Sequence, residues 1–169
     1  MNAKIKCLAL LASFAALPAL AQEPVVGVDD PESLFTDPDP RLHANKQVAL
    51  RIMRELLQCN YWDQADQWLT ERYLQHNPNV GSGRAGVVAF FTATRERTPT
   101  CDELTMPIVA VLADGDLVTV VWPMRCEMPG TTETYSSTWF DMWRIVDGKA
   151  DEHWDPAMKI PTGCQVGVE

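Results

Sequence analysis

The chain has 169 residues, 46% of them hydrophobic and 22% charged, a composition typical of a globular protein and unlike that of disordered, collagenous or repeat chains. Its length suits one domain. The chain has 14 Lys and Arg residues against 23 Asp and Glu residues, so the formal net charge is −9. Because affinity for nucleic acid and for anionic membrane surfaces rests on Lys and Arg, we expect neither as a partner.

Residues 1–21 have the pattern of a secretory signal peptide. Two lysines precede an apolar run from Cys7 to Leu20, and the small residues Ala19 and Ala21 form a cleavage site. This run of about 14 residues, interrupted by a proline, is shorter than the ~20 that span a bilayer. We therefore expect cleavage at about Ala21, no membrane anchor afterwards, and a secreted or periplasmic protein.

Four cysteines follow this leader, an even number that predicts two disulfides in an exported protein. Three pairings are possible. We favour Cys101 with Cys126, because they flank two apolar segments joined by an Asp-Gly hairpin signal. Cys59 with Cys164 then follows by elimination. A zinc site is disfavoured, because no two of these cysteines have the short spacing of paired zinc ligands.

Proline and acidic residues dominate the segment that follows the leader. Residues 22–40 contain four prolines and six Asp or Glu residues, too much of both to hold a core. We interpret this segment as an acidic arm or linker. The folded domain is then expected over residues 41–169.

Three helices are predicted in the first part of this domain. Apolar residues with one buried stripe predict a helix over residues 41–57. The same spacing recurs over residues 61–73 and stops before Pro78, which predicts a second helix. A Gly-Ser-Gly turn, with Ser82 as a candidate cap, precedes the stripe of a third helix over residues 87–94.

Beyond Cys101 the apolar period changes to two and the residues become β-branched and aromatic, which predicts strands. The four expected strands cover residues 104–113, 117–124, 134–146 and 149–157. Tight turns are marked by Asp-Gly pairs, and Pro123 indicates a strand edge or a bulge. Helices followed by an antiparallel meander predict an α+β domain in which the helices cover one face of the sheet.

The last two predicted strands collect side chains suited to acid/base chemistry. Trp139, Asp141 and Trp143 share one face of the third strand, and His153 and Asp155 share one face of the fourth. A three-residue turn would place Asp141 opposite His153 and beside Asp155, whereas a two-residue turn would break this arrangement. The cluster would then be walled by aromatic rings. The alternative is that these charged residues face solvent on a sheet with one wet side.

Metal and phosphate sites find little support in the spacing of residues. A metal site made of His76, His153 and Asp155 is conceivable, but no H-x-x-x-H or similar spacing supports it, and we expect none. The glycine-rich stretch at residues 81–86 follows no predicted strand and lacks the lysine of a phosphate-binding loop. A turn that starts a helix explains it better.

Four motifs between residues 73 and 155 carry a resemblance to a known family. They are Tyr73-Leu-Gln-His-Asn-Pro78, Gly83-Arg-Ala-Gly86 leading into Phe90-Phe91, Phe140-Asp-Met-Trp-Arg144, and Asp147-Gly-Lys149 ending in Glu152-His-Trp-Asp155. In order and spacing they resemble the SnoaL-like branch of the nuclear-transport-factor-2-like superfamily over residues 41–157. The resemblance implies a cone-shaped α+β barrel, in which a curved antiparallel sheet wraps around N-terminal helices and encloses one pocket, often in a homodimer.

The resemblance also implies a chemistry. SnoaL-like polyketide cyclases close a ring by intramolecular aldol condensation without metal or organic cofactor, and one acidic residue transfers the proton. The matching position here is Asp155, whereas Asp141 stands where those cyclases commonly carry histidine. The expected function is therefore a cofactor-independent acid/base enzyme, an aldol-type cyclase or isomerase, acting on a small hydrophobic carbonyl compound. The alternative is a periplasmic protein that binds a small ligand in the same pocket without turnover.

Each candidate site residue has an expected role. Asp155 is the base that removes a proton next to the carbonyl, and His76, His153 and Asp141 orient or polarise the oxygen. The expected pocket wall consists of Tyr73, Asn77, Phe90, Trp139 and Trp143.

Overall fold

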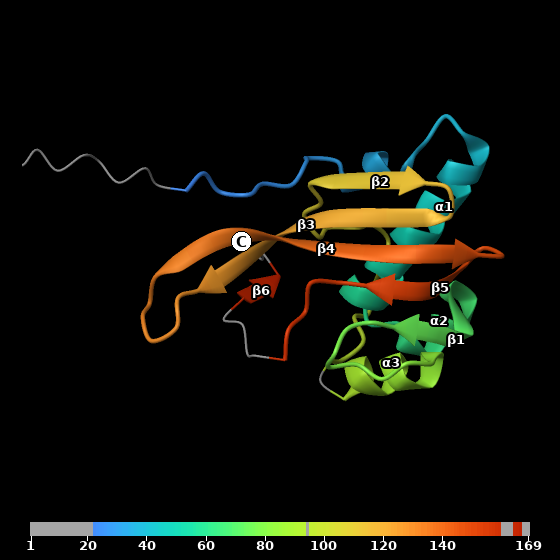
Figure 1. Cartoon of the computed structure of the whole chain (residues 1–169). Coiled ribbons are helices and arrows are strands. Elements are labelled where there is room, and N and C mark those ends of the chain that lie inside the picture. Colours follow the sequence, from blue (N-terminus) through green and yellow to red (C-terminus); the bar gives the residue numbers. More distant parts are fainter. Residues whose placement is uncertain (1–21, 94, 160–163, 167–169) are drawn as a thin grey trace, which may run out of the picture.

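A layer of helices lies against one face of a curved sheet in the computed structural model, which describes residues 22–93, 95–159 and 164–166 (Figure 1). The helical elements are η1 (Pro31–Phe35), α1 (Pro40–Arg51), η2 (Ile52–Gln58), η3 (Trp62–Gln64), α2 (Ala65–Trp68) and α3 (Arg84–Thr92). The strands are β1 (Leu69–Gln75), β2 (Ala110–Asp114), β3 (Leu117–Glu127), β4 (Thr134–Val146), β5 (Lys149–Trp154) and β6 (Cys164–Val166).

The sheet has six strands, five of them in the order β1-β5-β4-β3-β2, with β6 paired to β3. The predicted meander from β2 to β5 is confirmed, since its neighbouring strands all pair antiparallel. β1 is an addition to it and runs parallel to β5, so the sheet is mixed and not purely antiparallel as predicted. The predicted α+β class and cone-shaped architecture are confirmed.

The first helix forms because its start is well capped and one stripe is apolar. The Asp39 carboxylate accepts hydrogen bonds from the backbone N–H groups of Arg41 and Leu42, and Pro40 occupies the first turn. From Ile52 to Gln58 the helix continues as the wider π-helix η2. The predicted helix over residues 41–57 is thus confirmed in extent.

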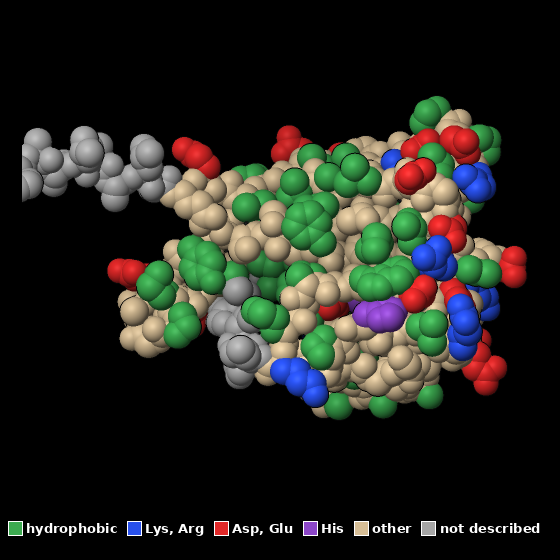
Figure 2. Space-filling view, viewed as in Figure 1, with side chains coloured by type: hydrophobic (Ala, Val, Ile, Leu, Met, Phe, Trp, Pro, Cys, Tyr) green, Lys and Arg blue, Asp and Glu red, His purple; other side chains and the backbone are tan. Residues whose placement is uncertain are grey.

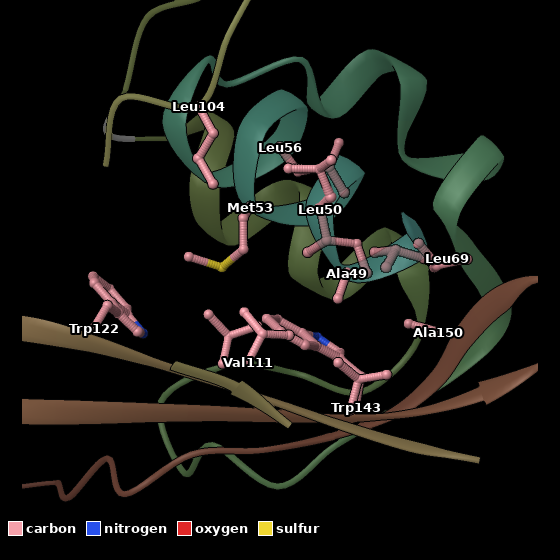
Figure 3. Packing of buried hydrophobic residues seen from close by; sticks show 14 of the residues in the cluster. Ala49, Leu50, Met53, Leu56, Leu69, Leu104, Val111, Trp122, Trp143 and Ala150 are labelled. Atoms are coloured by element: carbon pink, nitrogen blue, oxygen red, sulfur yellow. The ribbon is translucent and has the colours of Figure 1, made fainter. Parts of the chain in front are cut away.

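The core lies between this helix and the inner face of the sheet (Figure 3). Met53 and Leu56 are completely buried, and they face the side where Trp143 of β4 and Val111 of β2 project from the sheet. Full burial of one such side chain contributes about 1.5–3 kcal/mol to folding. Among the described residues no helix is long and apolar enough to cross a bilayer.

The second predicted helix is wrong from Leu69 onward. Residues 62–68 form the short helices η3 and α2, but the chain becomes extended at Leu69 and continues as β1. Leu69 and Tyr73 are both buried on one face. Because four residues separate them, they share a face in a helix and in a strand alike, and their spacing cannot distinguish the two.

The third helix is confirmed as α3, but its predicted cap is wrong. Gly83, with φ 86°, is the residue before the helix, and no side chain caps it. The Ser82 hydroxyl instead accepts a hydrogen bond from the backbone N–H of Gln75, at 3.0 Å. The serine therefore ties the turn to the end of β1 and does not start the helix.

The first predicted strand is shorter than expected, because residues 104–109 are not in a strand. Pro107 lacks the backbone N–H that pairing with a neighbouring strand would require.

Pro123 lies at a position of β3 where one side has no pairing partner, as predicted for a strand edge. The backbone N–H of Val109 bonds to the carbonyl of Val121, so residue 121 of β3 points its backbone polar groups toward the β2 side. Residue 123, two positions further along the strand, points toward the same side. β2 pairs only as far as Val121, and β6 begins its pairing at Met124.

The turn between β4 and β5 has two residues, not the predicted three. Asp147 and Gly148 both have positive φ, 50° and 76°, and Val146 pairs with Lys149. The register then shifts by one residue, because Asp151 is inserted between the partners of Ile145 and Arg144. This bulge restores the predicted faces of β4 and β5 but not the predicted partners, so the prediction that Asp141 lies opposite His153 is wrong. Trp143 consequently lies opposite His153, and both face inward.

The bulge is held by an ion pair on the outer side of the sheet. The Asp151 carboxylate accepts hydrogen bonds from the Arg72 guanidinium and from the Thr70 hydroxyl of β1. The arginine lowers the pKa of Asp151 more than burial raises it, and the Thr70 bond lowers it further. Figure 2 views this outer face, where charged side chains gather toward the β1 and β5 side.

The acidic arm is not a loose linker. Phe35 of η1 is completely buried in the main core, so the prediction that the arm holds no core residue is wrong. The backbone N–H of Val28 bonds to the carbonyl of Ile108, and Glu32 forms an ion pair with Arg54 of η2. The arm thus runs along the domain before α1 begins (Figure 1).

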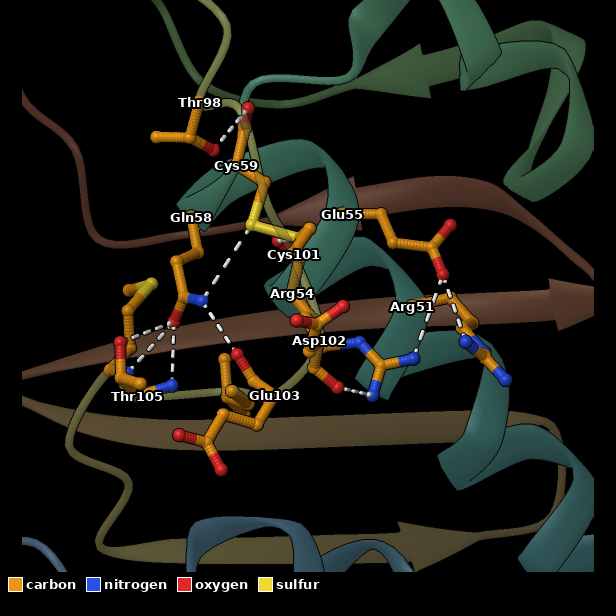
Figure 4. The surroundings of a disulfide bond; sticks show 12 residues. Arg51, Arg54, Glu55, Gln58, Cys59, Thr98, Cys101, Asp102, Glu103 and Thr105 are labelled. Carbon is orange, nitrogen blue, oxygen red and sulfur yellow. Dashed lines mark hydrogen bonds and ion pairs between the residues drawn. A yellow bond between two sulfur atoms is a disulfide. The ribbon is translucent and has the colours of Figure 1, made fainter.

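Both predicted disulfide pairings are wrong. Cys59, at the end of η2, is bonded to Cys101, with a Cα–Cα distance of 5.9 Å (Figure 4). This excludes Cys101–Cys126 and Cys59–Cys164. The hairpin signal at Asp114-Gly115 was real, but Cys101 lies too far before β2 to take part in the hairpin. Cys126 is itself disulfide-bonded, and the register sets residue 164 opposite it.

We expect the second bridge to join Cys126 to Cys164, because directly opposed residues of antiparallel strands lie within disulfide reach. Mass-spectrometric mapping of proteolytic peptides from the unreduced protein tests this connectivity. Detection of a peptide that links Cys59 to Cys164 would contradict both assignments.

Removing the first bridge is expected to destabilise the fold. The bond closes a loop of 42 residues, so a Cys59→Ala/Cys101→Ala variant should lose up to about 4 kcal/mol of unfolding free energy, by the loop-entropy relation. Urea unfolding measures the loss. A change below about 1 kcal/mol would show that the loop is already ordered without the bond.

The Arg72–Asp151 pair predicts a pH dependence of stability. Since the folded-state pKa of Asp151 is lowered, its contribution is fully present above the unfolded value near ~4 and is lost as the pH falls through the folded value. Arg72→Gln should lower the urea midpoint at neutral pH and reduce the difference between neutral and acidic midpoints. Equal pH profiles for the two proteins would refute this role.

Candidate functional site

A cavity of about 210 Å³ lies between the helices and the inner face of the sheet. Its lining is mainly apolar and aromatic, with a few polar groups concentrated on the sheet. The apolar lining residues are Ile52, Leu57, Trp62, Leu69, Tyr73, Val80, Val87, Phe90, Phe91, Met106, Trp122, Trp139 and Trp143. The polar ones are Gln75, Asn77, Arg95, Asp141, His153 and Asp155. This combination of an apolar wall and few convergent polar groups is typical of ligand sites.

The structure brings most of the predicted site residues to this cavity. The predicted members found there are Asp141, His153, Asp155, Tyr73, Asn77, Phe90, Trp139 and Trp143. Alternation along β4 and β5 places Asp141, Trp139, Trp143 and His153 there, and the bulge at Asp151 keeps the inward faces of the two strands aligned. The alternative, in which Asp141 and His153 face solvent, is excluded because both are buried.

His76 does not belong to this group. Its Nε2 atom lies 2.9 Å from a carboxylate oxygen of Glu152, and its ring stacks on Trp154. The side chain is 48% exposed, on the outer side of the sheet. His76 lies one residue beyond β1, and a strand's alternation turns it away from the cavity while Gln75 and Asn77 face inward. The prediction that His76 acts in the site is therefore wrong.

Asp141 is a buried carboxylate whose oxygens are taken by N–H donors. One oxygen accepts from the indole of Trp122 at 2.8 Å. The other accepts from the indole of Trp139 at 3.2 Å and lies 2.9 Å from Nε2 of His153. Charge-assisted bonds of this kind stabilise a buried carboxylate. Asp141 is therefore fixed in place and suited to positioning its neighbours.

His153 has an oxygen beside each ring nitrogen. Nε2 faces Asp141, and Nδ1 lies 2.7 Å from Oε1 of Gln75. That Gln75 oxygen also accepts the backbone N–H of Asn77 at 3.0 Å, which fixes the orientation of the amide. Both ring nitrogens are thus engaged by protein oxygens, and His153 is suited to holding the network together and not to acting as the base.

Asp155 is the carboxylate with acceptor capacity left. Its side chain is 4% exposed. It accepts the Asn77 side-chain amide at 2.7 Å and the Ala157 backbone N–H at 2.9 Å. Nδ1 of His153 lies 4.0 Å away, outside hydrogen-bond range. Each Asp155 oxygen thus has one such donor, which leaves lone pairs that can accept a proton.

Tyr73 provides a hydroxyl in the same cavity. Its oxygen accepts the indole N–H of Trp143 at 3.1 Å, which leaves its own hydrogen for another acceptor. Burial raises the pKa of the Tyr73 phenol far above its usual value, and the nearby Asp141 and Asp155 carboxylates raise it further. The hydroxyl therefore stays protonated and can donate to a ligand oxygen. The sequence predicted Tyr73 only as part of the wall.

Two residues of this network were missed by the sequence interpretation. Trp122 holds Asp141 from β3, and Gln75 holds His153 from β1. Trp122 pairs directly with Trp139 across the β3–β4 ladder. The signal was available for this pair, since two tryptophans on adjacent predicted strands mark a shared face. For Gln75 no signal existed, because β1 was taken for a helix.

Asp141, His153 and Asp155 are a group that could hold a metal ion, with one ligand atom from each within 4.8 Å of the others. Their contacts argue for a different use. Both Asp141 oxygens already accept N–H donors, and a metal would have to displace His153 from one of them. The donor set is therefore better explained as a hydrogen-bond network than as a metal centre.

Comparison with known families supports this reading of the fold. The family described as SnoaL-like domain matches residues 50–153. The chain belongs to the SnoaL-like family. The expected resemblance is thus confirmed over most of the folded domain. A search of curated proteins finds no match.

Solved structures share the SnoaL-like fold at low sequence identity. A candidate polyketide cyclase from Acidithiobacillus ferrooxidans has 18% identity and a TM-score of 0.50, covering 71% of this chain and 89% of its own. One from Bacillus cereus has 18% identity and a TM-score of 0.50, with coverages of 83% and 89%. A candidate SnoaL-like polyketide cyclase from a Jannaschia species has 17% identity and a TM-score of 0.50, with coverages of 72% and 91%.

The network around Asp141 predicts a large stability effect. Asp141→Leu leaves two indole N–H groups and His153 without an acceptor, so it should cost roughly 3–5 kcal/mol of unfolding free energy. Asp141→Asn retains one acceptor and should cost less. Urea unfolding followed by tryptophan fluorescence measures both. Equal stability of Asp141→Leu and the wild type would contradict the role assigned to this carboxylate.

Proposed function

We propose that this SnoaL-like protein is a cofactor-independent acid/base enzyme, an aldol-type cyclase or isomerase, that acts on a small hydrophobic carbonyl compound. The observation that carries the proposal is the pairing of one buried carboxylate that has free lone pairs, Asp155, with the Tyr73 hydroxyl donor in an apolar cavity. A carboxylate of this kind can act as a general base when a C–H proton is acidified by an adjacent carbonyl.

The roles follow from the donors and acceptors at the site. The Asp155 carboxylate takes a proton from the carbon next to the carbonyl, and the electrons of that C–H bond form an enolate. The Tyr73 hydroxyl donates a hydrogen bond to the enolate oxygen, because its own oxygen already accepts from Trp143. Asp141 keeps the His153 ring in place. The enolate then attacks a second carbonyl carbon, and the alkoxide formed there takes the proton back from Asp155, or the enolate itself is protonated again by Asp155.

The second candidate function is ligand binding without turnover. The cavity of about 210 Å³ is small, and its lining is mainly apolar and aromatic with few polar side chains. Such a cavity suits the binding of an apolar molecule without a reaction. The family relationship is compatible with either function, because fold does not determine activity. Proton exchange at a bound ketone separates the two.

Export is part of the proposal. The leader pattern lies in residues outside the described part of the chain. The Cys59–Cys101 disulfide supports an oxidising compartment, since such bonds are rare in reducing cytoplasm.

A homodimer is proposed from the apolar side chains on the outer sheet face, where Leu112 is 59% and Phe140 47% exposed. Sedimentation of the wild type and of Phe140→Asp tests the dimer.

Asp155→Asn is the decisive substitution for the enzyme. We expect the wild type to exchange the protons next to the carbonyl of small ketones for deuterium in D₂O, measured by NMR. The variant should exchange them 10²-fold to 10⁴-fold more slowly, because a general base typically contributes about that factor. Ketone affinity and unfolding free energy should change little, since Asn keeps the shape of the side chain.

Glu152→Gln is the matched control, because it neutralises a carboxylate three residues earlier, on β5, that faces the outer side. Its exchange rate should equal that of the wild type. Persistent exchange in Asp155→Asn would show that this residue is not the base. Ketone binding by the wild type with no catalysed exchange would favour the binding protein.

A further inference from the structure

The cavity borders a larger groove. Leu57, Arg95 and Met106 line both the cavity and a groove of about 1090 Å³ that lies between the N-terminal arm and residues 103–107. The two spaces therefore meet at these three side chains. The cavity alone, at about 210 Å³, is smaller than the ~300–1,000 Å³ of most ligand pockets. A ligand of ordinary size must extend from it.

The arm forms a fixed wall of this groove. The Val25 N–H bonds to the Ser136 hydroxyl at 2.7 Å, and the Val28 N–H to the Ile108 carbonyl at 2.8 Å. Between them Gly27 lies so close to the domain that a Cβ would stand 2.8 Å from Pro107 Cβ and 2.9 Å from Ile108 N. The glycine is what lets the arm approach, so the position of the arm is specified by its sequence.

The opposite wall is also held in place. The Gln58 side-chain oxygen accepts the backbone N–H groups of Thr105 and Met106, at 2.7 and 2.9 Å. Its amide nitrogen donates to the carbonyl of Glu103 at 2.8 Å (Figure 4). The neighbouring Cys59–Cys101 bond ties the same segment to the end of η2. The groove is thus a built feature between two anchored walls.

The arm presents an apolar edge to the groove. Val26 and Val28 are 71% and 40% exposed, and both line the groove. Since the arm is extended there, residues two apart lie on the same side. Pro107 and Pro123 add apolar surface. Exposed apolar side chains gathered along a groove indicate an apolar occupant.

We propose that this groove binds the apolar chain of the ligand whose carbonyl group lies beside Asp155. The inference rests on the proposed function for the position of the carbonyl. It specifies the substrate class, which is a ketone with a flexible alkyl chain that passes Leu57 and Met106 and lies along Val26 and Val28. Arg95, at the junction, is the single cation among the described residues that line either space.

The test is the affinity of the oxidised protein for 2-pentanone, 2-octanone and 2-undecanone, measured by calorimetry. Burial of each added methylene is worth about a fourfold gain in affinity, so the longest ketone should bind far more tightly than the shortest. Val26→Asp should weaken 2-undecanone about tenfold or more and leave 2-pentanone within twofold. Val146→Asp is the matched control, because it makes the same substitution at an exposed valine that lines neither space, and it should change neither affinity.

The outcomes separate this inference from the proposed function. Equal affinities for the three ketones, or an equal effect of Val26→Asp on all of them, would overturn the groove as a binding site. Chain-length dependence with no catalysed proton exchange would support the groove and overturn the enzyme. Failure of every ketone to bind would overturn both.

Discussion

The arrangement of polar side chains on the inner face of the sheet depends on the burial of one carboxylate, that of Asp141. An unpaired charge in such an environment would cost several kcal/mol, so each of its oxygens requires donors. They come from three adjacent strands, through Trp122 of β3, Trp139 of β4 and His153 of β5. Gln75 extends the chain of contacts to β1. The polar network therefore crosses the sheet and fixes where the reactive Asp155 can lie.

The elements that were predicted correctly have hydrophobic patterns that fit only one type of secondary structure. Alternation over β4 gave its bounds and faces, because a residue period of two has no helical equivalent over 13 residues. The helix over residues 41–57 was equally clear. The prediction of a helix over residues 61–73 was wrong in its second part, because two buried positions four residues apart fit both periods. The parallel strand β1 and the role of Gln75 were missed for the same reason.

The candidate site was predicted through two errors that compensated each other. The turn was expected to have three residues and has two, and the bulge at Asp151 adds a residue to β5, which restores the predicted faces while Trp143, and not Asp141, becomes the partner of His153. A bulge is set by contacts from another strand, here Arg72 and Thr70 of β1, and local sequence cannot show them. His76 was misplaced for the same reason, since its side depends on β1. The disulfide pairing failed because it depends on the tertiary path of residues 93–109.

The segment that joins α3 to β2 has a consequence for how the protein can diversify. It supplies Arg95 and Met106 to the cavity, yet it is held by the Gln58 amide and a disulfide and not by the ladder of the sheet. Substitutions there change the entrance without disturbing Asp141, His153 or Asp155. Under the proposed function, ligand selectivity and proton transfer thus belong to separable parts of the chain, and an altered ligand range can evolve while Asp155 stays constant.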